Sequence, residues 1–185
     1  MSLPDTTAMS LAMDRYAEGE DSAFAEVYDQ LAPKLLGFLV RQTRDLAHAE
    51  DLVQQTFLQM HCARATYVTG ADVVPWAFAI ARRLSIDAFR RKREVHDNDL
   101  QDTALTECTT PADLFRGKAA AHLVQRTLEA LPEAQRAAFE LIRYDGLTVV
   151  QAAEALGTTV TAVKLRAHRA YEALRCALHQ AELRS

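Results

Sequence analysis

Two clusters of positively charged side chains carry the clearest chemical signal in this sequence. Residues 82–93, RRLSIDAFRRKR, are rich in Arg and Lys and contain a single acid, Asp87. Residues 164–175 contain a second group, Lys164, Arg166, Arg169 and Arg175. Contacts from such side chains to phosphates dominate the affinity of proteins for nucleic acid. Because the net charge is −4, the compensating acids lie elsewhere, and the two clusters predict two points of contact with one polyanion.

The second cluster lies within a pattern that predicts a helix-turn-helix. Thr148 and Gln151 have the spacing of a capping box, which begins a short helix. Gly157 then offers a tight turn, and Thr158 or Thr159 can cap the helix that follows. At about 100° per residue, that helix should bury one apolar face: Val160, Val163, Ala167, Ala170, Tyr171 and Leu174. The opposite face is polar and basic, with Arg166 at its flank, and comprises Thr161, Lys164, Leu165, His168 and Arg169.

This outward face has two interpretations. A helix in the major groove of DNA presents cations for phosphates beside side chains that reach base edges. Alternatively, the segment is an αα-hairpin whose charged face is solvated, since charged helix faces are common. The glycine turn, the two caps and the uniform sign of the charges favour DNA binding.

The first cluster ends a predicted helix over residues 76–93. Cations at a helix C-terminus also suit the helix dipole, so the cluster alone does not decide between a structural and a functional role. The nearby aromatics Trp76, Phe78 and Phe89 favour single-stranded DNA, whose bases stack on rings while its backbone attracts cations. For Trp76 and Phe78 the alternative, a place in the core, remains the more common one.

The elements that must position these clusters are predicted to be helices. Strong helix formers dominate, glycines number only 6 and prolines 5, and apolar residues recur at helical spacing, so we expect an all-α fold. Helices are expected over residues 22–43, where Pro33 should kink or split the helix, and over residues 46–65. A loop over residues 67–74 follows, and Pro75 then suits the first turn of the helix that carries the first cluster.

Residues 94–113 interrupt the helical pattern. They are acidic, rich in Asp and Thr and poor in large apolar residues, which predicts a flexible linker between two domains. The pattern returns after Pro111, and a helix that begins at Pro132 should stop at Asp145-Gly146, with the glycine as its cap. The expected organisation is an N-terminal tail over 1–19, a three- or four-helix domain over 20–93, a flexible acidic linker over 94–117 and the helix-turn-helix domain over 118–180.

Composition and motifs argue against several other classes of protein. Apolar residues make up 49%, enough for a buried core, yet no apolar run reaches the roughly 20 residues of a membrane span. Residues 1–20 show no secretion signal, and three separated cysteines without a CxxC pair indicate reduced thiols, so we expect a cytoplasmic protein without stable membrane contact. No P-loop, nucleophile elbow, HExxH motif or metal-ligand spacing occurs, so we expect no enzyme, no metal and no cofactor.

Three stretches, in this order, resemble the extracytoplasmic-function sigma factors, the minimal branch of the sigma-70 family. HAEDLVQQTFLQMH (48–61) is similar to the helix of region two that docks on RNA polymerase. PWAFAIARRLSID (75–87), with the basic run 90–93, is similar to the helix that melts and reads the minus-ten element. LPE (131–133), DGLT (145–148) and the helix-turn-helix resemble region four, which reads the minus-thirty-five element.

The resemblance implies an alternative sigma factor controlled by an anti-sigma factor. It would bind core RNA polymerase, through the clamp helices of the largest subunit and the flap of the second largest, and direct initiation at promoter DNA. The implied polymerase contacts are Glu50, Asp51, Gln54, Gln55 and Phe57. The implied minus-ten contacts are Arg82, Arg83, Ser85, Ile86, Asp87, Arg90 and Arg91. The implied minus-thirty-five contacts are Thr161, Lys164, Leu165, Arg166, His168 and Arg169.

Two positions depart from the family pattern, and two rival functions remain. Such factors often carry Asn where Arg83 stands, which leaves the minus-ten base preference open, and Thr161-Ala162 replaces the usual Gly-Thr pair. One rival is a polymerase-independent helix-turn-helix regulator, although the dimerisation helix with which such proteins read two half-sites is not visible. The other, a sigma-mimicking adapter that binds an anti-sigma factor and no DNA, is disfavoured by the basic recognition face and the lack of a receiver domain.

Overall fold

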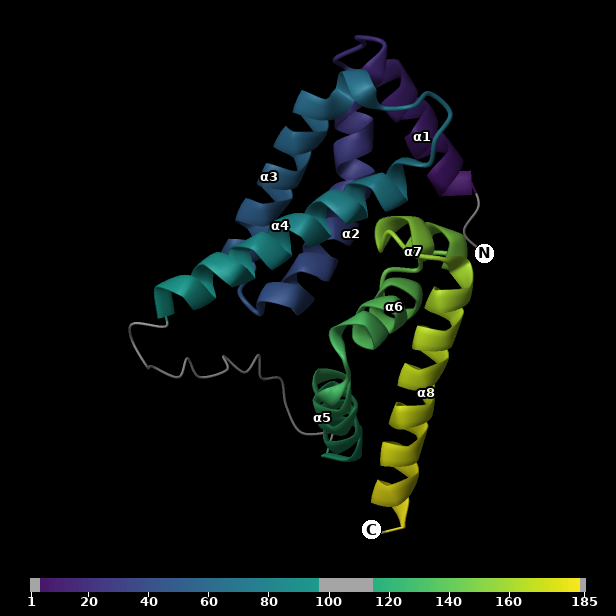
Figure 1. Cartoon of the computed structure of the whole chain (residues 1–185). Coiled ribbons are helices and arrows are strands. Elements are labelled where there is room, and N and C mark those ends of the chain that lie inside the picture. Colours follow the sequence, from purple (N-terminus) through teal and green to yellow (C-terminus); the bar gives the residue numbers. More distant parts are fainter. Residues whose placement is uncertain (1–3, 97–114, 184–185) are drawn as a thin grey trace. The chain divides into compact units, whose positions relative to one another are not determined.

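The computed structural model describes residues 4–96 and 115–183, and within these ranges every regular element is a helix, which confirms the all-α prediction. The chain divides into two compact units. The first contains α1 (Pro4–Ala17), α2 (Ala23–Thr43), α3 (Leu46–Ala63) and α4 (Val73–His96), with a 3-10 turn at Arg64–Thr66. The later part of the chain forms α5 (Phe115–Ala130), α6 (Glu133–Arg143), α7 (Val149–Ala155) and α8 (Val160–Glu182), and all of these except the last two residues of α7 belong to the second unit (Figure 1).

The core of the first unit brings α3 and α4 together. Val27, Leu31, Leu35 and Phe38 recur at helical spacing along α2 and are buried, so they form one apolar face. Both α3 and α4 pack against α2 and against each other, and the rings of Phe38 and Phe78 meet with 5.4 Å between their centres. Each large side chain buried in this way contributes about 1.5–3 kcal/mol. This packing decides which faces of α3 and α4 are left for solvent.

The predicted N-terminal tail over residues 1–19 is wrong for residues 4–17. They form α1, which packs against α2 and buries Met9, Met13 and Tyr16. The Tyr16 hydroxyl shares a hydrogen bond with Nδ1 of His61, and the guanidinium of Arg64 lies 5.4 Å from the centre of the Tyr16 ring. Met9, Ala12, Met13 and Tyr16 have the i, i+3, i+4 and i+7 spacing of a helix face, so the sequence contained a signal for this helix that the prediction overlooked.

The helix α2 runs without a break through Pro33, so the predicted split does not occur. Proline cannot donate a hydrogen bond to the carbonyl four residues earlier, which here belongs to Asp29. Both Pro33 and Asp29 are exposed, so water can bind that carbonyl instead. An exposed proline therefore costs this helix less than a buried one would.

The loop between α3 and α4 is anchored on α1. Gly70 adopts a φ of +81°, which favours glycine, and its N–H donates to the Asp14 carboxylate at 2.9 Å. The ring of Tyr67 lies 5.2 Å from that of Trp76, and burial raises the pKa of the Tyr67 hydroxyl to about 12. The position of the first turn of α4 therefore depends on α1, although the two helices are far apart in the sequence.

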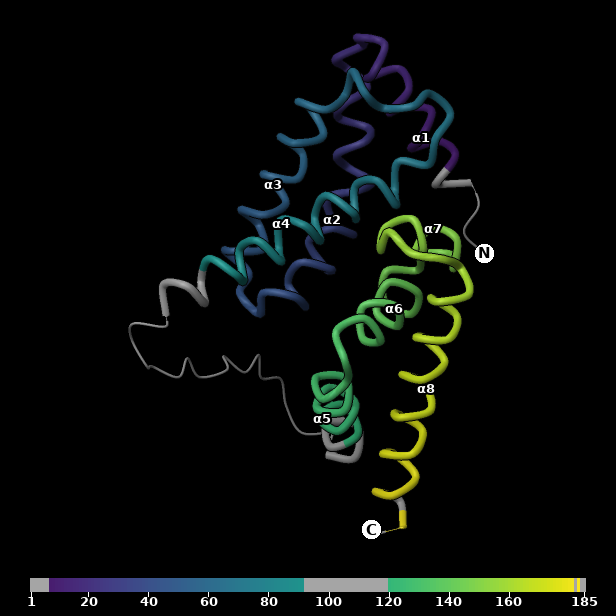
Figure 2. The backbone as a smooth tube through the Cα atoms, viewed as in Figure 1, coloured from purple at the N-terminus to yellow at the C-terminus, as the bar shows by residue number. Residues whose placement is uncertain are grey.

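The second unit closes around a small apolar core. Its helix α8 packs against both α6 and α5, as the backbone trace shows (Figure 2). Helix α6 begins directly after Pro132, as predicted, but ends at Arg143, and Gly146 turns the chain with a φ of +70°. The core comprises Leu128, Phe139, Ala170 and Leu174, with Val124 and Leu131 packed against it.

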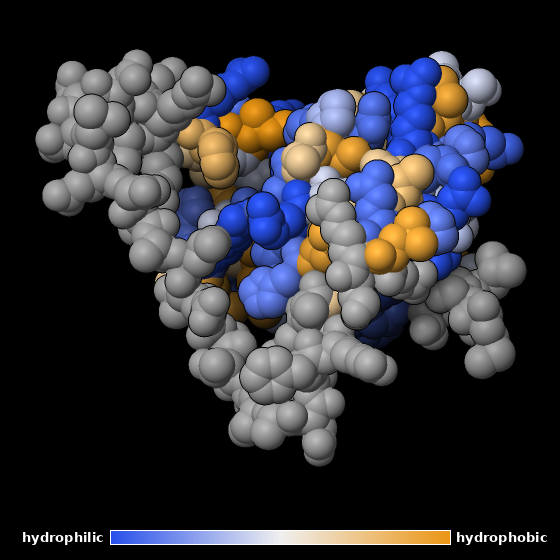
Figure 3. All heavy atoms as spheres, turned by 90° about the horizontal axis from the view of Figure 1, so that it is seen from below, coloured by the Kyte–Doolittle hydropathy of each residue, from blue (hydrophilic) through white to orange (hydrophobic). Residues whose placement is uncertain are grey.

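The predicted linker lies mostly outside the described residues. Of the expected range 94–117, residues 94–96 end α4, which extends further than predicted, and residues 115–117 begin α5, after the return of the helical pattern predicted beyond Pro111. None of the described helices combines the length and the apolar character that crossing a membrane requires. On the face drawn in Figure 3, hydrophilic residues alternate with small apolar patches.

Replacing Met13 with alanine should destabilise the first unit by about 2–5 kcal/mol, because a buried methionine loses its contacts and leaves a cavity. Leu11→Ala, on the same helix, should change stability by less than about 0.5 kcal/mol, because Leu11 is 58% exposed. The only tryptophan, Trp76, lies in this unit. Its fluorescence during urea unfolding therefore measures the free energy of unfolding of each variant. Equal effects of the two substitutions would show that α1 is not packed as described.

Candidate nucleic-acid interface

The helix-turn-helix forms through the local interactions that the sequence predicts. The N–H of Thr148 donates to Oε1 of Gln151 at 2.8 Å, and the N–H of Gln151 donates to the Thr148 hydroxyl at 3.2 Å, which completes the capping box. Gly157 turns the chain with a φ of +58°. Of the two candidate caps for α8, Thr159 is the one used, and its hydroxyl accepts the N–H of Ala162 at 3.1 Å. The capping box thus marks the start of α7, and the Thr159 bond marks the start of α8.

Burial divides α8 into the two faces that the helical angle predicts, with two exceptions. Val163, Ala170 and Leu174 are buried, whereas Val160 and Tyr171 are 36% and 53% exposed, so these two were wrongly placed in the core. Val160 is the first residue of the helix and extends past the core, while Tyr171 lines a groove described below. The five residues of the α8 outward face are all exposed, with Arg166 half-buried at the flank: Thr161, Lys164, Leu165, His168 and Arg169.

The cations of the α8 outward face are available to a ligand. Within the described part of the chain, Lys164 and Arg169 form no ion pair, whereas Arg175, further along the helix, binds Glu172 at 2.6 Å. Unpaired cations on one face create a positive potential that an ion pair would cancel. The electrostatic attraction of α8 for an anion is therefore strongest on its outward face.

Helix α4 exposes the first basic cluster. Arg83, Asp87, Arg90 and Arg91 are exposed, while Arg82 and Ile86 are half-buried. The guanidinium of Arg83 donates to Oε1 of Gln59 on α3 at 3.1 Å. Arg90 and Arg91 also line a hollow between α3 and α4, with Gln55, Gln59, Leu84 and Asp87.

Ser85 does not belong to this surface, contrary to its place among the predicted minus-ten contacts. It is only 8% exposed, and its hydroxyl donates to the Arg82 carbonyl at 2.8 Å within the helix. Its side chain therefore cannot meet DNA without a rearrangement. Gln59 was missed by the sequence analysis, because only the packing of α3 on α4 brings it beside Arg83.

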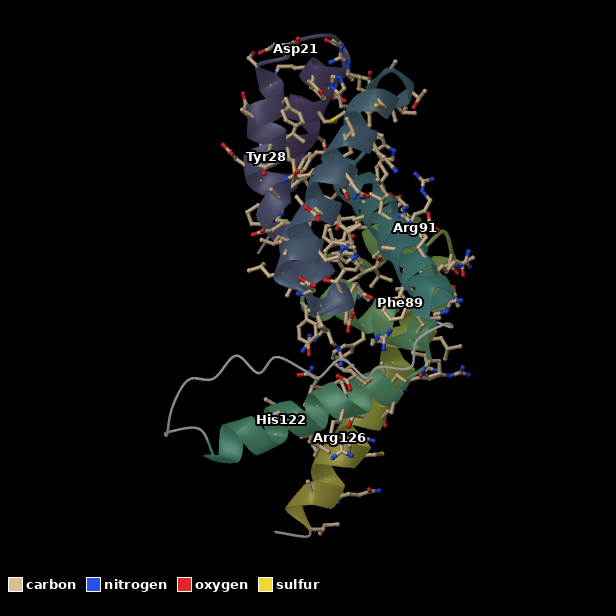
Figure 4. The ribbon with its side chains drawn as sticks, turned by 90° about the vertical axis from the view of Figure 1, so that its left-hand side faces the viewer. Asp21, Tyr28, Phe89, Arg91, His122 and Arg126 are labelled. Atoms are coloured by element: carbon tan, nitrogen blue, oxygen red, sulfur yellow. The ribbon has the colours of Figure 1, made fainter. Side chains whose placement is uncertain are left out.

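The three aromatic residues of α4 have different surroundings. Phe78 is fully buried against Phe38, and Trp76 is half-buried beside Tyr67, so both serve the core, the alternative that their residue types favoured. Phe89 is 67% exposed and lies on the same helix as Arg91 (Figure 4). Phe89 is thus the α4 aromatic that a base could stack on without displacing another ring.

The α3 polar face consists of Glu50, Asp51, Gln54 and Gln55, and the structure exposes all four. Leu58, 62% exposed, continues this face by one turn. Phe57, predicted as a polymerase contact, is only 4% exposed, and its ring packs against Tyr28 at 4.7 Å and Phe24 at 5.8 Å. Phe57 therefore supports α3 from inside, and in the free chain its ring offers almost no surface to a partner.

The second unit contains a groove that the sequence did not reveal. Its apolar lining includes Phe139, Leu174 and the exposed ring of Tyr171. Arg143, Arg175 and His179 place positive or titratable groups around it, and Val124, Cys176 and Leu178 complete the lining. Because α8 extends well beyond the helix-turn-helix, apolar positions such as Leu178 could have suggested a second apolar stripe. We call this the α8 groove.

Each of the two helical units matches a known protein family region. Two family models match, "Sigma-70 region 2" over residues 27–95 and "Sigma-70, region 4" over residues 121–174. The RNA polymerase sigma factor CarQ of Myxococcus xanthus is 33% identical over 171 residues, which cover 92% of this chain and 98% of that protein. The ECF RNA polymerase sigma factor SigF of Caulobacter vibrioides is 30% identical over 169 residues, 91% of this chain and 92% of that one.

A solved structure agrees with these matches. The sigma factor RpoE of Bartonella quintana, in complex with the anti-sigma factor NepR, has a TM-score of 0.66 and 26% identity, covering 84% of this chain and 96% of that chain. Two helical units, each exposing a cationic helix and one carrying a helix-turn-helix, define a DNA-binding protein with two contact surfaces. The family matches are more specific: the chain belongs to the extracytoplasmic-function sigma factors of the sigma-70 family.

Lys164→Ala and Arg169→Ala should each flatten the salt dependence of binding to duplex DNA, by about one unit in the slope of log affinity against log salt concentration. Any duplex can serve as the probe, because phosphate contacts carry no sequence information. Arg126→Ala is the control, since Arg126 is an exposed cation on α5 (Figure 4) and lies off the α8 outward face. Fluorescence anisotropy over a salt series measures the slopes; unchanged slopes for both α8 variants would refute the assignment of this face.

Proposed function

We propose that this chain is an alternative sigma factor that binds core RNA polymerase and directs it to promoters. The observation that carries the proposal is the pair of exposed cationic helices, α4 and α8, which overlap the matches to sigma-70 regions 2 and 4. α4 would contact the minus-ten element through Arg82, Arg83, Ile86, Asp87, Arg90 and Arg91. α8 would contact the minus-thirty-five element through its outward face and Arg166.

The α3 polar face is proposed as the docking surface for the clamp helices of the largest polymerase subunit. Its two acids and two amides offer hydrogen-bond partners, and Leu58 adds an apolar contact beside them. Interfaces combine such polar contacts with a few apolar anchors. Phe57 contributes by holding α3 against α2, so it acts through the fold.

The α8 groove is proposed as the docking surface for the flap of the second largest subunit. An apolar groove of this kind suits an amphipathic helix, whose apolar side chains enter it at helical spacing. Tyr171 is well placed as an anchor, since aromatic rings supply large contact areas at interfaces. Arg143, an exposed cation at the groove, would favour a partner helix with an acid along its edge.

Phe89 is proposed to stack on an unpaired base of the minus-ten element. Base–aromatic stacking contributes about 1–3 kcal/mol per base, and Arg90 and Arg91 beside the ring would attract the strand's phosphates. A melted promoter needs such a contact, because removing a base from the duplex costs a few kcal/mol. The exposed ring would offset part of that cost.

Core polymerase would make the two weak DNA contacts act as one. Two binding modules held at a suitable spacing convert the second binding event into an intramolecular one, so their combined affinity can exceed either alone by about 10²–10⁴. We assign no catalytic step to the chain, because RNA synthesis belongs to the polymerase. We also propose that the chain works in the cytoplasm, where bacterial polymerase and promoter DNA are.

An anti-sigma factor is proposed as the regulator. The related RpoE of Bartonella quintana was solved in complex with one. In the free chain the α3 polar face and the α8 groove are both exposed, so a protein that covers either surface would prevent polymerase from docking there. Competition for shared surfaces needs no conformational change in the sigma factor.

Transcription in vitro tests the proposal as a whole. Core RNA polymerase is incubated with a genomic promoter library, with and without the chain, and the RNA start sites are mapped. The proposal predicts a set of start sites that appear only with the chain and share two conserved elements at a constant spacing. An unchanged start-site profile would refute it.

Asp51→Ala combined with Gln55→Ala should raise the dissociation constant for core polymerase about tenfold, a loss of about 1.4 kcal/mol, because two polar contacts disappear. The fold should persist, since both side chains are exposed. Glu18→Ala removes an exposed acid outside the α3 polar face and serves as the control. Unaltered affinity of the double variant in a surface-binding assay would exclude this docking surface.

Phe89→Ala should weaken binding of the holoenzyme to fork-junction DNA with a single-stranded minus-ten element by about tenfold, because stacking is lost. Phe89→Trp should retain binding, and Phe89→Leu should behave like the alanine variant, since leucine is apolar without a π-face. Affinity for duplex DNA that carries only the minus-thirty-five element should not change. Full binding by Phe89→Leu would show that the contact is apolar packing and not stacking.

A further inference from the structure

Leu165 is an anomaly on the α8 outward face. The other four residues of that face are polar or charged, yet Leu165 is apolar and 48% exposed. Its exposure is not a consequence of an overfilled core, because Val163 and Ala170 on the opposite face are completely buried. The side chain therefore does little for the stability of the unit, and its apolar surface is available for a ligand.

The position of Leu165 is suited to contact bases. It is the sixth residue of α8, which begins at Val160 after the Thr159 cap. In a helix-turn-helix the N-terminal part of the second helix lies deepest in the major groove and contacts base edges. Thr161 precedes Leu165 by one turn and Arg169 follows it by one turn, so Leu165 lies in the middle of the exposed surface.

The chemistry of leucine limits what it can recognise. Its side chain neither donates nor accepts a hydrogen bond, so it cannot read the donors and acceptors that distinguish most base edges. The 5-methyl group of thymine is the one apolar group that the unmodified bases present in the major groove. We propose that Leu165 selects a thymine within the minus-thirty-five element by contact with its 5-methyl group.

This inference rests on the proposed function and adds a base preference to it. Lys164 and Arg169 would bind phosphates on either side of the leucine, which sets the register without reading sequence. Leu165 would then favour one base at one position. Without the thymine, the apolar surface of Leu165 would face a polar base edge, and the free energy gained by burying the methyl group against it would be lost.

The test uses a chemical change that removes only the methyl group. Holoenzyme first selects duplexes from a library whose minus-thirty-five region is randomised. Each thymine of the selected sequence is then replaced singly by deoxyuridine, which keeps every hydrogen-bonding group of the base. At one position the wild-type holoenzyme should bind the uracil duplex about fourfold more weakly, as expected for one methyl group that is no longer buried.

Variants test whether the weaker binding of the uracil duplex depends on Leu165. Leu165→Ser should bind the thymine and uracil duplexes equally, whereas Leu165→Met should keep the discrimination because its side chain is also apolar. Leu183→Ala, which removes an exposed leucine at the other end of α8, is the matched control and should behave as wild type. Thermal unfolding of each variant verifies that the second unit stays folded.

Two results would overturn the inference while leaving the proposed function intact. One is selection of a minus-thirty-five element in which no thymine-to-uracil change weakens binding. The other is a Leu165→Ser holoenzyme that discriminates as wild type does. If holoenzyme selects no minus-thirty-five sequence at all, the proposed function itself fails, and the inference fails with it.

Discussion

The burial of one face of each cationic helix determines which charges this protein can present to DNA. α8 must bury Val163, Ala170 and Leu174 against α5 and α6, and this requirement turns Lys164 and Arg169 outward. α4 is subject to the same constraint, because burial of Phe78 and Leu84 leaves Arg83, Arg90 and Arg91 exposed. The apolar packing inside each unit thus determines which cations lie on its surface. The specificity of the proposed DNA contacts follows from packing as much as from charge.

Features that depend on neighbouring residues could be predicted from the sequence. The capping box of Thr148 and Gln151, the Gly157 turn and the Thr159 cap are made by residues at most three apart or by a single backbone angle. The helical angle then predicted the outward face of α8. For such features local chemistry decides the structure, so no tertiary information is needed.

Features that depend on distant residues could not be predicted. For Phe57 the helical spacing with Val53 and Met60 indicates the apolar side of the helix, and only its partners, Phe24 and Tyr28 of α2, could not be predicted. The helical angle places Tyr171 on the buried face, but the core of the second unit includes Leu174 and leaves the tyrosine exposed at the α8 groove. Helix α1 has the spacing of a helix with one apolar face, but the surface against which that face packs is supplied by α2. In each case a partner from another helix decides the outcome.

Neither unit should bind promoter DNA tightly until core polymerase holds both. The most direct measurement is the affinity of the intact chain for a promoter duplex, with and without core polymerase, at one fixed salt concentration. We expect weak and sequence-independent binding by the chain alone, and tight, sequence-specific binding once core polymerase is added. Nanomolar, sequence-specific binding by the chain alone would contradict this expectation and would favour a regulator that acts without polymerase.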